Sequence, residues 1–474
     1  MAAVDPLLTN EDIEAAAGGP QINMVAAQTR IRPKLLAARE LFSMNYIIDA
    51  NKYPTVYITS DIHADYRKFI QILQDANLIS RDLDPYTEDI YNPRMITETR
   101  WIGGPGILVV LVGDIVDGRR KFGWSFSDVD DTRGSFEFLL HAFLHNIRIR
   151  ALAADSNVIF TIGNHDLESI IAVGNLMTSG LGTYLYDTYV HATSKTFFLD
   201  RPGVRMGALL QFYRNCPFYF LSIQDGDKRE VACVHGGLHG LGDYYGKTLD
   251  HSDSLIHIQE EIAKGGDLVA NTPKIWYEDD FQRSPLGNPL WTRLYSTKRG
   301  GSCDLVNALP YSLVVVGHCP THNQSLRHTE LIATQARFSE CDHGEPGDNR
   351  PGCILLDCDG DEHDKAPKLA FVDTALSKSQ RVPPGVALIP DINNRIRGVQ
   401  VLRLRHSLEH QINGAFYNVI EKVTQGVAEQ LYAEPIIEAM IEAAKGGRRS
   451  TRRRKTYHKF ESKRSKRSKH RSRK

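Results

Sequence analysis

The residues between 55 and 377 contain a series of short apolar runs, each of which ends at a polar loop. One of them, ILVVLV at 107–112, lies between glycines and has six consecutive apolar residues, which is typical of a strand covered on both faces. Segments with helical patterns separate the runs, and this alternation predicts an α/β fold. The predicted strands lie in TVYITSDIH, GILVVLVGD, NVIFTIGNHD, EVACVHGG, YSLVVVGH and KLAFVDT.

Side chains that can bind cations or transfer protons directly follow five of these runs. In chain order they are Asp61 and His63, Asp114 and Asp117, Asn164 and His165, His235, and His318. A single residue of this kind after a strand is usually a helix cap or an ordinary loop residue. A parallel sheet, however, brings the carboxyl ends of its strands together, and ligands bind there. We therefore expect the five segments to form one site.

The chemistry of these side chains indicates a metal centre. Carboxylates, imidazoles and an amide, without a thiolate, are the ligands that hard and borderline divalent cations prefer. Two cations that lie close together repel each other, so a shared carboxylate is needed between them, and Asp114 is the candidate. A pair of metals about 3.5–4 Å apart can hold the attacking and leaving oxygens of a phosphoryl group and lower the pKa of bound water. This pattern predicts phosphoester hydrolysis by direct in-line attack of hydroxide.

The order of the motifs DxH, GDxxD, GNH[DE], HGG and GH resembles that of the calcineurin-like metallophosphoesterases, over about residues 53–377. Within that superfamily the chain is most similar to the phosphoprotein phosphatases (serine/threonine phosphatases) of the bacterial-type branch. The segments VHGGL, NPLWTRLYS and LAFVDTALSKS carry this closer similarity. The resemblance implies a metallophosphoesterase β-sandwich flanked by helices, and a metal-dependent phosphoric ester hydrolase.

The resemblance also implies a role for individual residues. Two divalent ions (Mn, Fe, Zn or Mg, with Mn expected to serve best in vitro) would be held by Asp61, His63, Asp114, Asn164, His235 and His318, with Asp114 shared. His165 would be the general acid that protonates the leaving oxygen, and Asp117 would orient its imidazole. Arg293 in LWTR would bind the substrate phosphate, for which a planar bidentate donor is suited.

The chain departs from the pattern of the protein phosphatases at several positions. Gly118 stands where that family has a phosphate-binding arginine, and Arg119 follows directly. A shift of the loop by one residue would bring Arg119 to the phosphate, whereas without the shift it would face solvent or the acidic body of the protein. Ser60 and Ala64 stand where the family usually has glycines, and Asp166 where it has glutamate.

The substrate class is less constrained than the metal centre. Phosphoserine and phosphothreonine in proteins are the leading expectation from the resemblance. Dinucleoside polyphosphates and other small phosphoesters are the alternatives, because related enzymes process them with the same metal centre. The loops at 119–150 and 240–290 are expected to decide between these substrates.

The carboxyl-terminal segment from 448 to 474 is strongly basic. It contains 15 lysines and arginines and one glutamate, which leaves 42 basic and 56 acidic residues upstream. With so few apolar residues, this tail is expected to be disordered in isolation. It could bind nucleic acid through phosphate neutralisation, attach to another acidic partner, direct nuclear import, or only solubilise the protein. A nucleic-acid-associated or particle-associated protein with an ancillary phosphatase domain is therefore a second functional hypothesis.

Four segments are predicted: a leader with one helix at 1–50, the catalytic domain at 51–377, a strand with a helical extension at 378–447, and the disordered basic tail at 448–474. The leader helix is expected in PKLLAARELFSMNYIIDA, and the extension is expected to have a strand in GVQVLRL followed by helix from about 407 to 445.

The protein is expected to be soluble and intracellular, in the cytoplasm or the nucleus, without a membrane partner. No apolar run approaches the roughly 18–20 residues that span a bilayer, and the amino terminus lacks the order of charges and apolar residues of a secretory signal. The seven cysteines are odd in number and dispersed, which indicates a reducing compartment rather than a disulfide framework.

Overall fold

The computed structural model describes one compact unit of the chain, which spans residues 1–379 and 399–425. The described residues are 4–17, 30–31, 33–35, 37–38, 46–63, 66–85, 92–115, 136–167, 219–238, 259, 261, 289–291, 306, 309–318, 337–339, 354–357, 369–373, 401–406 and 417–423. The predicted basic tail and most of the predicted helical extension lie outside them.

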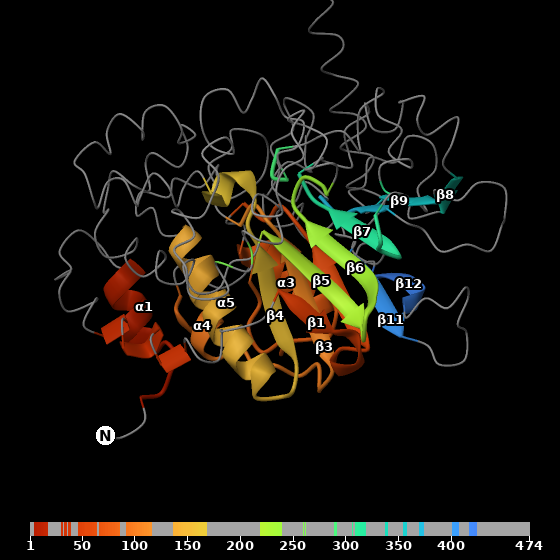
Figure 1. Ribbon diagram of the computed structural model, residues 1–474. Coiled ribbons are helices and arrows are strands. Elements are labelled where there is room, and N and C mark those ends of the chain that lie inside the picture. The colour runs from red at the N-terminus through yellow and green to blue at the C-terminus, as the bar shows by residue number, and fades with distance from the viewer. Residues whose placement is uncertain are drawn as a thin grey trace, which may run out of the picture. The chain divides into compact units, whose positions relative to one another are not determined.

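A five-stranded sheet carries the first three predicted strands (Figure 1). Its order is β12-β11-β2-β3-β4, with β2 at Thr55–Thr59, β3 at Ile107–Val112, β4 at Asn157–Thr161, β11 at Val401–His406 and β12 at Tyr417–Val423. Strands β2, β3 and β4 are parallel, whereas β11 and β12 are antiparallel to their neighbours. The carboxyl ends of β2, β3 and β4 therefore meet at one edge of the sheet.

A second, seven-stranded sheet has the order β1-β5-β6-β7-β10-β9-β8. Its strands are β1 at Ile47–Asp49, β5 at Phe220–Asp225, β6 at Lys228–Val234, β7 at Leu313–Val316, β8 at Arg337–Ser339, β9 at Ile354–Asp357 and β10 at Leu369–Phe371. Strands β6, β7 and β10 are parallel, and the remaining pairs are antiparallel except β1 with β5. The carboxyl ends of β6, β7 and β10 thus also meet at one edge.

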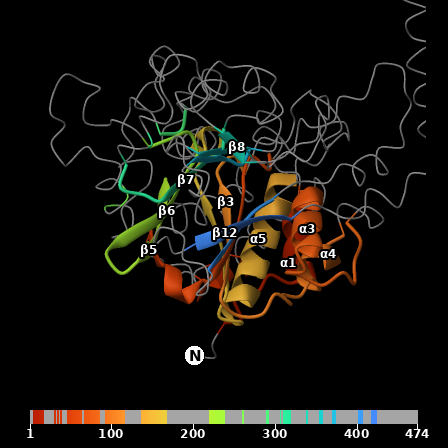
Figure 2. The same ribbon diagram turned by 90° about the vertical axis from the view of Figure 1, so that its right-hand side faces the viewer.

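Helices α3 at Tyr66–Asp75 and α5 at Phe136–Leu152 cover one face of the five-stranded sheet (Figure 2). Helices α1 at Asn10–Ala17 and α4 at Arg94–Thr97 pack against α5, and a short 3-10 helix, η1 at Ala50–Lys52, contacts β5 of the second sheet. Figure 2 shows α3 and α5 on one side of β3, and β5, β6 and β7 on the other. The prediction of an α/β fold is confirmed, and its sheets contain both parallel and antiparallel strands.

The position of β3 between two layers explains its sequence. From Leu108 to Val112 every residue is buried, because helices cover one face of the sheet and the second sheet covers the other. The amino-terminal leader packs against α5: the Asn146 side chain on α5 accepts a hydrogen bond from Leu8 N (2.9 Å) and donates one to Leu8 O (3.0 Å). An uninterrupted apolar strand is the sequence that such a position requires.

Two predictions of helix are wrong where short strands occur. Residues 417–423, within the predicted extension helix, form β12, and β11 pairs with β2 of the five-stranded sheet. Residues 47–49, within the predicted leader helix, form β1, although residues 33–35 and 37–38 are helical. Both strands contain β-branched residues and pair along a strand that would otherwise be an edge, so tertiary pairing decides the conformation.

Helix α1 was not anticipated, although the sequence contains a start signal. Thr9 N donates to Asp12 Oδ2 (2.8 Å), and Asp12 N donates to Thr9 Oγ1 (3.4 Å). This reciprocal pairing is a capping box with aspartate in place of glutamate. Within the described part of the chain, no helix is both long and apolar enough to cross a membrane.

Candidate metal centre

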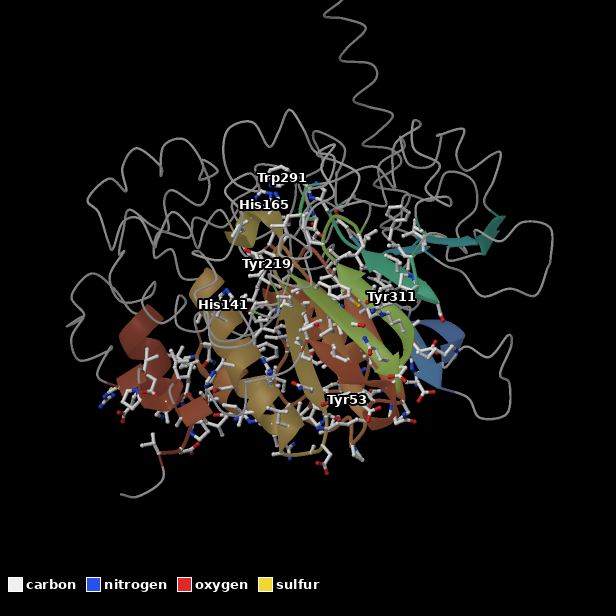
Figure 3. All side chains as sticks on the ribbon, in the orientation of Figure 1. Tyr53, His141, His165, Tyr219, Trp291 and Tyr311 are labelled. Atoms are coloured by element: carbon white, nitrogen blue, oxygen red, sulfur yellow. The ribbon has the colours of Figure 1, made fainter. Side chains whose placement is uncertain are left out.

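Seven of the predicted site residues lie together where the carboxyl ends of the two sheets meet. They are Asp61 and His63 after β2, Asp114 after β3, Asn164 and His165 after β4, His235 after β6, and His318 after β7, and each is at most 9% exposed. Hydrogen bonds join the sheets here; among them, His318 N donates to Asp61 Oδ2 (3.0 Å), and His235 Nδ1 donates to Val112 O (2.8 Å). Figure 3 shows His165 at this end of the strands and Tyr53 at the opposite end. The predicted Asp117, Arg119 and Arg293 lie outside the described residues.

The residues form two candidate metal-binding groups that share Asp114. One group is Asp61, His63 and Asp114, and the other is Asp114, His235 and His318. In each group the ligand atoms lie within 4.8 Å of one another. Asp114 Oδ1 lies 3.3 Å from His235 Nε2, whereas Oδ2 lies 3.8 Å from His63 Nε2. The two oxygens of one carboxylate therefore face different groups, which is one arrangement in which a carboxylate can be shared by two cations.

The Asn164 side chain fits a cation in the second group. Its Oδ1 lies 2.9 Å from His235 Nε2, and its buried Nδ2 has no hydrogen-bond partner among the described residues. Two ligands at right angles and about 2.1 Å from one cation are about 3.0 Å apart. Oxygen and nitrogen donors at this spacing, with no thiolate, match the ligand preferences of a divalent ion such as Mn²⁺, Mg²⁺, Fe²⁺ or Zn²⁺.

Four of the site residues have a strained backbone. Of the six residues other than glycine with positive φ in the described part of the chain, four are Asp61 (φ 54°), His63 (48°), Asp114 (53°) and His318 (59°). Each such conformation costs about 1–3 kcal/mol and persists only where surrounding structure enforces it. Strain is thus concentrated at the candidate ligands.

Two glycines permit the close approach of the loops that carry the ligands. A Cβ on Gly113, whose φ is 78°, would lie 2.5 Å from His235 Nδ1. A Cβ on Gly163 would collide with the backbone nitrogen and Oδ1 of Asp114. Glycine is therefore required in GD and GNH for steric reasons as well as for backbone freedom.

The buried carboxylate of Asp114 is stabilised in its ionised form by nearby positive charge. Burial alone would raise the pKa of Asp114, but the imidazoles of His235, His165 and His63 outweigh it and hold the pKa well below its usual range. Burial would lower the pKa of His235, but Asp114 and Asp61 raise it to about 10. Without a metal ion, His235 is therefore protonated at neutral pH. A bound cation would supply the same compensation with a larger charge.

A further carboxylate at the site was not assigned from the sequence. Asp373 lies two residues after the end of β10 and is 2% exposed. Burial, followed by the charge of Asp373, raises the pKa of Asp61 well above its usual range. The sequence contains the pattern that identified the other site residues, since LAFVD is an apolar run that ends in an acid.

His165 is the most exposed imidazole of the centre, at 9%. Its backbone N–H donates to Asp114 Oδ1 (3.0 Å), and its Nε2 lies 3.8 Å from Asp114 Oδ2. Its ring meets that of His63 edge to face, with centroids 5.2 Å apart. The neighbouring Asp166 accepts from Ile115 N (2.8 Å) and Gly163 N (2.9 Å), so it fixes the loop that presents His165.

The segment at 289–291 is attached to the HGG loop. Pro289 O accepts from Gly236 N (2.7 Å) and Gly237 N (3.2 Å). The Trp291 ring lies 5.7 Å from that of His318, at an interplanar angle of 75°. Figure 3 shows Trp291 at the same end of the strands as His165. Trp291, which was not assigned a role from the sequence, therefore forms part of the wall of the centre.

Comparison with known proteins gives a family match over most of this region. Residues 54–322, more than half of the chain, match the family model described as Calcineurin-like phosphoesterase. No curated protein matches the chain. Among solved structures, the chain is similar to a cold-active protein-tyrosine phosphatase of a psychrophilic Shewanella species, with a TM-score of 0.42 and 16% identity over 80% of this chain and 82% of that one. It is also similar to the phosphatase domain of the Legionella effector WipB, with a TM-score of 0.31 and 15% identity over 48% of this chain and 85% of that one.

Proposed function

The chain belongs to the calcineurin-like phosphoesterases, and from this premise we propose that it is a dinuclear-metal phosphatase that hydrolyses phosphomonoesters, with phosphoserine and phosphothreonine in proteins as the leading substrates. The observation that carries the proposal is the position of Asp114, whose two oxygens face His235 and His63 in different ligand groups. A pair of divalent ions held there would activate a water and stabilise charge on the phosphoryl group.

The residues of the chain itself supply orientation and proton transfer in this proposal. The His165 backbone N–H fixes the Asp114 carboxylate, and its imidazole is the one most open to solvent. These features support His165 as the general acid that gives its proton to the leaving oxygen. Asp117, proposed as its orienting partner, keeps that role as a prediction.

The closer assignment to the bacterial-type protein phosphatases is supported by the LWTR segment. Trp291 lies against His318, and Arg293 follows two residues later in the chain. We propose that Arg293 binds the substrate phosphate and that Arg119 assists in place of the arginine that is absent at Gly118. Lysine at either position would keep the charge but lose the planar bidentate contact.

A substrate comparison tests the proposal. Protein loaded with Mn²⁺ is supplied with p-nitrophenyl phosphate, a panel of phosphoserine, phosphothreonine and phosphotyrosine peptides, and diadenosine tetraphosphate. The expected result is the highest kcat/KM on phosphoserine or phosphothreonine peptides. A clear preference for diadenosine tetraphosphate would favour the alternative class of small phosphoesters, and no hydrolysis of any of them would contradict a phosphatase.

A further inference from the structure

Ser60 lies at the junction of the two candidate metal groups. Its side chain is fully buried, and Oγ lies 2.8 Å from Val112 O and in hydrogen-bonding contact with Asp61 Oδ2. We infer that Ser60 is a positioning residue, which orients the Asp61 carboxylate for a cation and connects it to the group that contains His235.

The two oxygens of the Asp61 carboxylate have different surroundings. Oδ2 contacts the Ser60 hydroxyl and accepts from His318 N at 3.0 Å. Oδ1 is directed toward His63, whose Nε2 lies 3.9 Å away. With Oδ2 held by protein donors, Asp61 presents Oδ1 to an ion of the first group. Hydrogen bonds of this kind to the ligands of a metal set both their orientation and the affinity for the ion.

The carbonyl oxygen of Val112 lies close to side chains from both sheets. It accepts a hydrogen bond from His235 Nδ1 (2.8 Å), and Ser60 Oγ lies 2.8 Å from it. The hydrogen bond to Nδ1 leaves the other ring nitrogen of His235 directed into the centre, 3.3 Å from Asp114 Oδ1. Ser60 Oγ and His235 Nδ1 therefore lie next to the same carbonyl oxygen, so Ser60 connects Asp61 of the first group to the backbone atom that orients His235 of the second.

The space around the hydroxyl suits a small side chain. A Cβ built on Gly317, the residue after β7, would collide with Ser60 Oγ, so the backbone at Gly317 packs directly against the serine. The proteins that this sequence resembles usually have glycine at this position, which brings no hydroxyl. The contact between Ser60 and Asp61 is thus a property of this chain rather than of the motif.

A purely structural role would have a different signature. If the hydroxyl only fixed the loop through Val112 O, its removal would lower the stability of the metal-free protein and leave its affinity for metal unchanged. If it orients Asp61, removal would weaken metal binding while the metal-free protein keeps its stability.

The test compares Ser60→Ala with Thr59→Val. Thr59 is the adjacent residue, and its buried Oγ1 has no hydrogen-bond partner in the described part of the chain, so it is a matched control for loss of a hydroxyl. Calorimetric titration of the metal-free proteins with Mn²⁺ measures stoichiometry and affinity, and thermal unfolding in EDTA measures stability. Ser60→Gly is a second variant that removes the hydroxyl and fits the same space.

The inference rests on the proposed metal centre, so the wild type is titrated first. We expect two Mn²⁺ per chain in the wild type and in Thr59→Val. In Ser60→Ala and Ser60→Gly we expect one of the two ions to bind about 10- to 100-fold more weakly, with kcat restored by excess Mn²⁺ and the unfolding temperature of Ser60→Ala in EDTA unchanged. Affinity for both ions equal to that of the wild type, or an equal loss in Thr59→Val, would overturn the role of Ser60. Failure of the wild type to bind Mn²⁺ would instead overturn the metal centre itself.

Discussion

Asp114 Oδ1 lies 3.3 Å from His235 Nε2, and both side chains are almost completely buried. The imidazole makes the ionised carboxylate favourable, and the carboxylate in turn raises the pKa of the imidazole to about 10. A cation that enters between them must replace the proton of His235. This competition makes the centre dependent on pH and on the charge of one residue.

Asp114→Asn is expected to reduce kcat by more than about 100-fold. Loss of a residue that only supports a metal ligand typically costs about 10- to 100-fold, and Asp114 is itself a candidate ligand, so its loss should cost more. The substitution keeps the shape of the side chain but removes the charge that both ligand groups share. Phosphatase assays with p-nitrophenyl phosphate and metal analysis by mass spectrometry measure the effect, and fewer than two ions should remain. Asp155→Asn is a matched control, because Asp155 also has positive φ but is exposed and precedes β4, whereas Asn164 and His165 follow the other end of that strand. Full activity of Asp114→Asn would contradict the shared carboxylate.

Metal binding should become tighter as the pH rises toward 10. The pKa of His235 in the metal-free protein is about 10, so at pH 8 its proton must be released when an ion binds. Calorimetry in two buffers with different ionisation enthalpies should detect about one proton released from His235 per chain. An affinity for Mn²⁺ that does not change between pH 6.5 and 8.5 would show that the ion does not displace a proton from His235.

His165→Asn is expected to lower kcat by about 100- to 10,000-fold if His165 is the general acid. The loss should be larger for a serine phosphate, whose leaving alkoxide needs a proton, than for p-nitrophenyl phosphate, whose leaving group does not. Metal stoichiometry should stay at two, because His165 is not among the candidate ligands. Equal losses on both substrates would indicate a role in binding or orientation instead.

Two buried histidines on α5 should make the protein sensitive to acid. Burial lowers the pKa of His141 to about 3 and that of His145 to about 4, from an ordinary value of 6.5. Below pH 6.5 the unfolded chain binds protons that the folded chain excludes, so stability is fully present above pH 6.5 and falls as the pH decreases toward 4. By pH 5, His145 alone should account for a loss of about 2 kcal/mol.

Urea unfolding in EDTA at pH 7 and pH 5 measures this loss. His145→Gln can still donate to Pro6 O, which lies 2.8 Å from His145 Nε2, but it cannot take up a proton. The variant should therefore lose less stability between the two pH values than the wild type. An equal loss in both proteins would mean that other groups cause the acid sensitivity.

The sequence predicted the parts of the fold in which local pattern and tertiary position agree. Apolar runs such as 107–112 had to become covered strands, and the polar residues that follow them had to meet at the sheet edge. The pattern was insufficient for β1 and β12, whose conformation depends on the strands they pair with. It also gave no role to Ser60, because the direction of its hydroxyl toward the neighbouring Asp61 depends on how the loop folds. Asp373 was left without a role although LAFVD ends in an acid, as the other apolar runs do. The metal-binding roles of Asp61, His63, Asp114, Asn164, His235 and His318 stay predictions that the geometry supports.

The basic tail should affect association without affecting chemistry. Truncation after Gly447 removes 15 lysines and arginines and one glutamate, and changes the formal net charge of the protein from 0 to −14. If the tail binds nucleic acid, the full chain should bind single-stranded RNA or DNA with an affinity that falls steeply between about 50 and 200 mM salt, because bound counterions are released. Fluorescence anisotropy should show this binding lost in the truncated protein, while kcat/KM on p-nitrophenyl phosphate is retained. Equal binding by both proteins would exclude the tail as the contact, and absence of binding by the full chain would leave an acidic protein partner, nuclear import or solubility as its role.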